Sequence, residues 1–170
     1  DTRLVGKHNV MNVLAAIAAV DFYDLSIDNI LTAVREFSGV KRRFEIKGKS
    51  AGITVVDDYA HHPMAIQATL GAARLHFPNQ KLWALFQPHT YSRTHALTSE
   101  IASSFYDADH VGITDIFASR EKDDRTISAK NILELMDHSD AHYVGDSNEA
   151  ARFIASKMQS GDVLITMSAG

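Results

Sequence analysis

The 170-residue chain contains no cysteine, so it forms neither disulfides nor thiolate metal sites. This absence fits a reducing cytoplasm. No run approaches the roughly 18 consecutive apolar residues of a membrane helix, and we recognise no signal-peptide pattern. Excess positive charge is also lacking. The formal net charge is −4, so no global field attracts nucleic acid or an anionic membrane, and any anion-binding site must be local.

The composition is that of an ordinary soluble globular protein, with 45% hydrophobic and 22% charged residues. The length suits one domain with a full core, or one domain plus part of another. The sequence starts without methionine and stops at MSAG. We therefore expect it to be part of a longer protein.

The first 38 residues are predicted to be helical. Residues 9–24 carry an apolar stripe at a spacing of about 3.6 residues. Ser26 is predicted to cap a second helix, which Gly39 is placed to end. No strand separates these helices, whereas strands and helices alternate afterwards. We therefore predict that residues 1–38 belong to a preceding domain and residues 39–170 to a domain of another kind.

The later pattern predicts an α/β fold. Short apolar runs around Gly48 and Gly52 indicate a hairpin, and Pro63 suits the first turn of a helix. Four further strands are predicted, alternating with helices: residues 82–86, 110–114, 143–144 and 163–167. This alternation predicts βαβ units and a mostly parallel sheet flanked by helices.

Three polar loops follow predicted strands: DDYAHHP (residues 57–63), QPHTYSRT (87–94) and TDIFASREKDD (114–124). Ligands of such sheets bind beyond the carboxyl ends of the strands. We therefore expect the site at these loops.

The first loop has two interpretations besides a proline-capped turn. A metal-dependent hydrolase would use its acids and imidazoles as zinc or manganese ligands, drawn from Asp57, Asp58, His61, His62, His89 and His95. The side chains of adjacent histidines point apart in most backbone conformations, however, and the sequence has no HExxH motif. The other interpretation is an acid–base or binding site without a metal.

Three other motifs are ambiguous by themselves. Asn9 in GKHN either caps the first helix or, with Asn12 on the same face, offers amides to an adenine edge. The cations of GVKRRFE form a solvated face or reach phosphates. Arg93 precedes a helix predicted to start at Thr94, where it either packs or binds an anion beside helix N–H groups. No GxGxxG or GxxxxGK[ST] phosphate cradle is present.

Together, GKHNVMN, GVKRRFE, VVDDYAHHP, FQPHTYSRT and LITMSAG closely resemble the C-terminal part of the Mur ligases of peptidoglycan synthesis. The FQPHxYSRT and DDYAHHP motifs resemble those of the members that add L-alanine. The resemblance implies three domains: one for the UDP-sugar, a central one with an ATP-binding P-loop, and a Rossmann-like C-terminal one. Only the last would be complete here, preceded by two helices from the end of the central ATPase domain (residues 1–38). The remaining domains would be its partners.

The resemblance also implies a reaction. ATP phosphorylates the lactyl carboxylate of UDP-N-acetylmuramate, and the amine of L-alanine attacks the acyl phosphate. Mg²⁺ bridges the nucleotide phosphates and is held mainly by the absent central domain. We expect a cytoplasmic enzyme, of which this chain alone is inactive.

Residue roles are implied at the matching positions. Asn9 and Asn12 match adenine-contacting amides, and Arg43 matches a nucleotide-binding arginine. Asp58 matches an aspartate near the ribose and phosphates, and we expect it to accept hydrogen bonds from the ribose hydroxyls.

Tyr59, His61 and Arg93 match positions lining the pocket for alanine and the muramyl carboxylate. Arg93 would grip alanine's carboxylate, and His61 would orient or deprotonate the ammonium. The predicted catalytic residues are His61, Asp58 and Arg93. One departure is Thr90, where many relatives have a second arginine. Arg93 then acts alone, or Lys81 or Arg120 assists.

Overall fold

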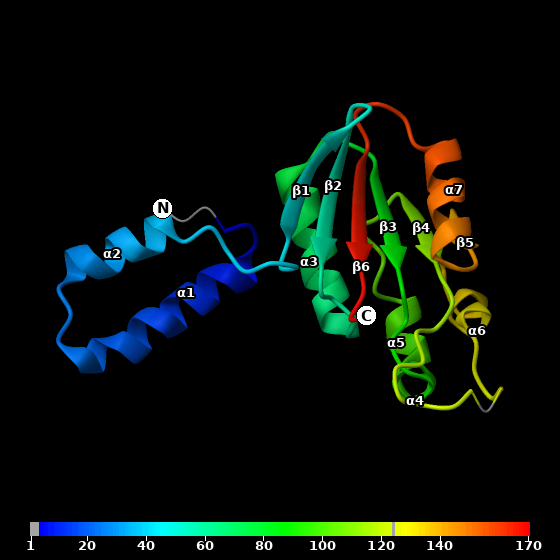
Figure 1. The fold of residues 1–170 in the computed structure, drawn as a ribbon, viewed down its shortest axis with the longest axis horizontal. Helices are drawn as coiled ribbons and strands as arrows, with labels where there is room; N and C mark the ends of the chain where they lie inside the picture. Colours follow the sequence, from blue (N-terminus) through cyan, green and yellow to red (C-terminus); the bar gives the residue numbers. More distant parts are fainter. Residues whose placement is uncertain (1–3, 124) are drawn as a thin grey trace.

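The computed structural model describes residues 4–123 and 125–170. Residues 1–3 of the predicted helical segment, and Asp124 of the third loop, lie outside the described residues. A pair of helices stands beside a body formed by one sheet and its covering helices (Figure 1). In the described part of the chain, no helix is long and apolar enough to cross a membrane.

The helical pair consists of α1 (Lys7–Val20), a short 3₁₀ turn η1 (Asp21–Tyr23) and α2 (Ile27–Glu36). Ser26 caps α2 as predicted, because its side chain accepts a hydrogen bond from the backbone N–H of Asn29 at 3.3 Å. The N-cap of α1 is Gly6, so Asn9 lies inside the first turn and the interpretation of Asn9 as a cap is wrong. Gly39, at φ 97°, lies beyond the end of α2 rather than at it.

The body contains a six-stranded sheet in the order β1-β2-β6-β3-β4-β5. The strands are β1 (Glu45–Ser50), β2 (Ile53–Asp58), β3 (Leu82–Phe86), β4 (His110–Ile113), β5 (Ala141–Tyr143) and β6 (Val163–Met167). The β1–β2 pair is the predicted antiparallel hairpin, and the other neighbouring strands pair in parallel. The mostly parallel α/β fold is therefore confirmed.

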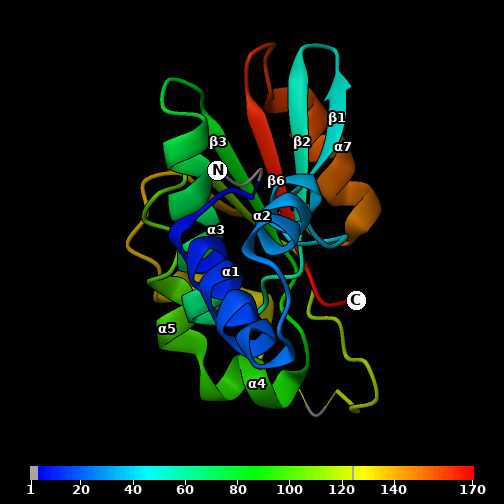
Figure 2. The same ribbon diagram turned by 90° about the vertical axis from the view of Figure 1, so that its left-hand side faces the viewer.

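In the part of the chain that the structure describes, five helices connect the strands: α3 (Pro63–His76), α4 (Tyr91–Ala96), α5 (Thr98–Ala102), α6 (Ala129–Glu134) and α7 (Ser147–Lys157). Pro63 occupies the first turn of α3, as its fixed φ favours. The connection through α3 and the return through α7 run in opposite directions across the sheet. Right-handed crossovers therefore place these helices on opposite faces, as Figure 2 shows.

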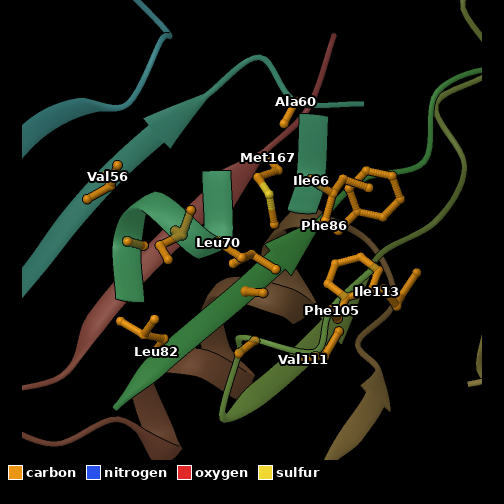
Figure 3. Packing of buried hydrophobic residues seen from close by; sticks show 14 of the residues in the cluster. Val56, Ala60, Ile66, Leu70, Leu82, Phe86, Phe105, Val111, Ile113 and Met167 are labelled. Carbon is orange, nitrogen blue, oxygen red and sulfur yellow. The ribbon is translucent and has the colours of Figure 1, made fainter. Parts of the chain in front are cut away.

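The core lies between the sheet and its helices (Figure 3). Its largest fully buried side chains include Phe86 of β3 and Phe105, whose rings meet edge to face with centroids 5.6 Å apart. Burial of this apolar surface is the main stabilising contribution to the fold. In contrast, neither α1 nor α2 contributes a buried residue.

The amino ends of the strands are tied by polar contacts. Asp109 accepts hydrogen bonds from Arg74 at 2.7 Å and from Lys81 at 3.0 Å. Burial raises the pKa of Asp109, but the bonds from Arg74, the Leu82 amide and Lys81 outweigh it and bring the pKa to about 2. Trp83 stacks on His110 at this end, with ring centroids 4.0 Å apart.

Candidate functional site

Four aromatic rings form a row along the carboxyl edge of the sheet: Tyr59, His61, His89 and Phe117. Neighbouring centroids in this ring row are 5.1, 6.1 and 5.7 Å apart. The rings come from the loops that follow β2, β3 and β4. All three loops chosen from the sequence therefore meet at one place, and Tyr59 and His61 lie together as predicted.

The hydrogen bonding of His61 defines its tautomer. Its Nδ1 lies 2.8 Å from the backbone carbonyl oxygen of Tyr59. A carbonyl oxygen only accepts, so Nδ1 carries the proton and the neutral ring keeps a bare Nε2. Nε2 is then free to act as a hydrogen-bond acceptor.

Arg93 and His89 form a second pair. The Nη1 of Arg93 donates to Nδ1 of His89 at 3.2 Å. The guanidinium has only donors, so Nδ1 of His89 is bare and its Nε2 carries the hydrogen. Burial, followed by the positive charge of Arg93, lowers the pKa of His89. His89 is therefore a neutral ring that offers one N–H, beside a permanent cation.

The N–H groups at the start of α4 bond to the chain's own oxygens. The amide of Ser92 donates to Glu121 at 2.9 Å, and that of Arg93 to the side chain of Thr90 at 3.4 Å. Helix α4 starts at Tyr91 rather than at the predicted Thr94, because Thr90 is its N-cap. The N–H groups of Ser92 and Arg93 are therefore engaged within the chain and do not form the suggested anion site. Anion binding by the guanidinium of Arg93 stays a prediction.

Neither suggested helper of Arg93 contacts it. Lys81 precedes β3 and is bonded to Asp109 at the amino end of the sheet, opposite to the loop that carries Arg93. Lys81 as a helper is therefore wrong. Arg120 is exposed on the loop after β4, and its help stays a prediction.

Arg42, to which the sequence assigned no role, joins the segment before β1 to β2 and to the residues after β6. Its Nη2 donates to the carbonyl oxygen of Ser168 at 2.6 Å, and its Nε lies 3.4 Å from a carboxylate oxygen of Asp57. Arg42 also lies over the Tyr59 ring, 5.1 Å from the centroid. The next residue, Arg43, is exposed, lies 5.8 Å from the centroid of the same ring, and lines the cavity described next.

A cavity of about 950 Å³ lies between the helical pair and α3. Its lining includes Asn9, Asn12, Arg43 and Asp58, so the residues predicted to bind nucleotide share one space. Asn9 donates to the carbonyl oxygen of Val5 at 2.7 Å and accepts from Asn12 at 3.4 Å. A smaller cavity of about 360 Å³ is also lined by Asn9 and Arg43.

Asp58 is only 4% exposed, and both of its carboxylate oxygens are used internally. One accepts from the amide of Phe44 at 2.7 Å and the other from the amide of Ala60 at 2.8 Å. Burial raises the pKa of Asp58, opposed by these bonds. In this structure Asp58 ties the residue before β1 to the loop after β2, and it also belongs to the lining of the cavity. The ribose contact expected of Asp58 stays a prediction.

The hydrolase alternative finds no support. Among residues 4–123 and 125–170, no three His, Asp or Glu side chains are grouped so that they could hold a metal ion. His62 and His95 are exposed, and Asp57 is engaged by Arg42 and by the hydroxyl of Thr166 at 2.8 Å.

Comparison with known proteins identifies the family. The model of the Mur ligase, glutamate ligase domain, matches residues 42–170. The chain belongs to the Mur ligase family. It is the C-terminal domain of a Mur ligase, and the family resemblance inferred from the sequence is confirmed. The predicted division at residues 38 and 39 stays a prediction.

The relatives of this Mur ligase domain agree among themselves. It is 46% identical over 168 residues to the UDP-N-acetylmuramate–L-alanine ligase of Alkaliphilus metalliredigens, covering 97% of this chain and 36% of the relative. The ligase of the same name from Caldanaerobacter subterraneus is 44% identical, with the same coverage. The chain thus spans little more than a third of the length of these relatives.

Solved structures share the arrangement. The UDP-N-acetylmuramate–alanine ligase of Thermotoga maritima has a TM-score of 0.81 at 31% identity, over 99% of this chain and 36% of that one. A murein peptide ligase from Psychrobacter arcticus has a TM-score of 0.74 at 27% identity, over 100% of this chain and 35% of that one.

Proposed function

We propose that the full-length protein joins L-alanine to the lactyl carboxylate of UDP-N-acetylmuramate through an acyl phosphate, at the expense of ATP. The names and identities of the relatives support this activity. Within the chain, one observation carries it: His61, from the loop after β2, meets the His89–Arg93 pair, from the segment after β3, at the carboxyl edge of the sheet. The enzyme would act in the cytoplasm, in peptidoglycan synthesis.

Arg93 and His61 would handle the amino acid. Arg93 is permanently charged, and the guanidinium N–H groups not used by His89 can grip a carboxylate. The bare Nε2 of His61 can take the proton that the ammonium group must lose before it attacks a carbonyl carbon. Tyr59 contacts the His61 ring and is covered by Arg42, so it would hold the wall of this pocket.

Asn9, Asn12 and Arg43 would bind the nucleotide. Their cavity has the volume of a typical ligand pocket, for which the range is roughly 300–1,000 Å³. When bound, ATP with its Mg²⁺ supplies the phosphoryl group that activates the carboxylate. Arg43 would approach the phosphates, and Asp58 would accept hydrogen bonds from the ribose hydroxyls. The helices of residues 1–38 would belong to the central domain.

The chain alone would be inactive, because charge stabilisation in the transition state depends on groups from the other domains. The test therefore uses the full-length protein. Phosphate release from ATP is measured with and without UDP-N-acetylmuramate and L-alanine. We expect release to require both substrates.

Arg93→Ala is the first variant to test. Loss of charge-assisted hydrogen bonds to the carboxylate should raise the KM for L-alanine by about 10- to 100-fold. Arg152→Ala, which removes an exposed arginine on α7, is the matched control and should behave as wild type. An unchanged KM in Arg93→Ala would place the alanine carboxylate elsewhere. A folded wild type without substrate-dependent phosphate release would contradict the ligase.

A further inference from the structure

The loop after β4 is attached along its length to the segment that carries His89 and Arg93. We call residues 115–121 the β4 loop. The amide of Phe117 donates to the carbonyl oxygen of Pro88 at 2.8 Å, and the amide of Thr90 donates to that of Phe117 at 2.9 Å. These bonds make a short parallel bridge between His89 and Phe117. The β4 loop therefore follows the backbone that leads into α4.

Both ends of the β4 loop are anchored. At its start, the Tyr143 hydroxyl donates to Asp115 at 2.6 Å, and the amide of Asp115 donates to the carbonyl oxygen of Gly145 at 3.0 Å. At its end, Glu121 receives two hydrogen bonds from Ser92, one from the amide and one from the hydroxyl. The loop is thus held between β5 and α4.

Glu121 suits the role of a fixed acceptor. Hydrogen bonds from the Ser92 side chain and then its amide lower the pKa of Glu121, so the group is ionised at neutral pH. An ionised carboxylate only accepts. Each of its two oxygens therefore holds one donor of Ser92, and the charge strengthens both bonds.

We propose that Glu121 is a positioning residue that fixes the first turn of α4 and thereby holds the guanidinium of Arg93 where the substrate carboxylate binds. This role rests on the proposed function. Glu121 acts through Ser92, the residue next to Arg93, and not through contact with the substrate. Without it, the turn must be ordered when the amino acid binds, and that ordering weakens binding.

The test measures the kinetics of the full-length protein with L-alanine and ATP as varied substrates. Glu121→Ala should raise the KM for L-alanine by about five- to tenfold, with the KM for ATP and kcat within about twofold of wild type. The matched control is Glu149→Ala. Glu149 also accepts a backbone N–H at the start of a helix, that of Asp146 at 3.0 Å, but on α7. Glu149→Ala should leave the KM for L-alanine unchanged.

Two further variants separate positioning from a general loss of structure. In an Arg93→Ala background, adding Glu121→Ala should raise the KM for L-alanine by less than a further twofold, because the group that Glu121 positions is already gone. Ser92→Ala leaves the carboxylate and the amide bond in place. It should raise the KM for L-alanine by about threefold, and it gives a readout even if Glu121→Ala does not fold.

Three results would overturn the proposal: an unchanged KM for L-alanine in Glu121→Ala, an equal rise in the KM for ATP, or full additivity with Arg93→Ala. Partial recovery in Glu121→Gln, which keeps an oxygen acceptor without the charge, supports it. Failure of the proposed function is distinguishable, because it is seen in the wild type alone as the absence of substrate-dependent phosphate release.

Discussion

The helical pair and the sheet body use apolar residues differently. Both carry the periodic apolar pattern expected of buried elements, but α1 and α2 bury no residue, whereas α3 buries six. The exposed large apolar side chains of this region are Val10, Met11, Leu14, Phe22, Tyr23, Leu25, Ile27, Leu31 and Phe37. Periodicity therefore predicts which face of a helix is apolar, but not whether the chain supplies a second layer to cover it.

The difference bears on the site. The proposed amino-acid half has His61 on the loop after β2 and Arg93 in α4, both next to the buried sheet. The proposed nucleotide half takes Asn9 and Asn12 from α1, which has no buried residue of its own. We infer that the amino-acid half is held more rigidly, because few buried contacts mean low local stability.

The largest expected contrast comes from the same substitution in both regions. Leu70 of α3 is 0% exposed and Leu14 of α1 is 54% exposed. Leu70→Ala should lower the free energy of unfolding by about 3 kcal/mol, through lost burial and a cavity. Leu14→Ala should change it by less than about 0.5 kcal/mol. Denaturant unfolding of both variants measures this, and equal effects would mean that the helical pair is packed as tightly as the body.

A smaller effect should appear in acid. The pKa of Asp109 is lowered to about 2 in the folded state, against about 3.9 when unfolded. A depressed pKa stabilises the fold above the unfolded value, and that stability is lost as pH falls from about 4 to about 2. Asp109→Asn should lower the free energy of unfolding by about 2 kcal/mol at pH 7. It should also weaken the dependence of that free energy on pH between about 4 and 2. Asp28→Asn, on exposed α2, is the control, and identical acid midpoints for Asp109→Asn and wild type would contradict the prediction.

The smallest effect compares two helix caps. Asp146 accepts the amides of Asn148 and Glu149 at the start of α7, and Ser26 caps α2. Removing either cap costs about 1 kcal/mol of helix stability. Asp146→Ala should lower the free energy of global unfolding by that amount. Ser26→Ala should only reduce helical circular dichroism before the main transition, and a shifted main transition in Ser26→Ala would show that the two regions unfold as one.

Local signals made much of the fold predictable. The strands at residues 82–86 and 163–167 match β3 and β6 residue for residue, because a buried parallel strand is a continuous apolar run with clear ends. The start of α4 was misplaced by three residues. Its N-cap Thr90 adopts φ 66°, a conformation that few residues other than glycine favour, and no local pattern indicated it.

The site was predictable only in part. Placing His61 and Arg93 at one edge follows from the rule on strand ends. The contacts of Arg42 with Ser168 and of Glu121 with Ser92 join residues 126 and 29 positions apart. Such contacts depend on the finished topology and leave no spacing in the sequence. The burial of Asp58 was missed for the same reason, since its partner Phe44 comes from across the hairpin.

The stacking of Trp83 on His110 has a practical consequence. The chain has a single tryptophan, and it lies in β3 at 6% exposure. Its fluorescence therefore changes when the sheet opens, but it has no counterpart in the helical pair. Far-ultraviolet dichroism recorded on the same sample includes the helices of both regions, so the emission would isolate the unfolding of the sheet body. Excited at a wavelength that tyrosine does not absorb, this tryptophan is an optical reporter of the sheet body alone.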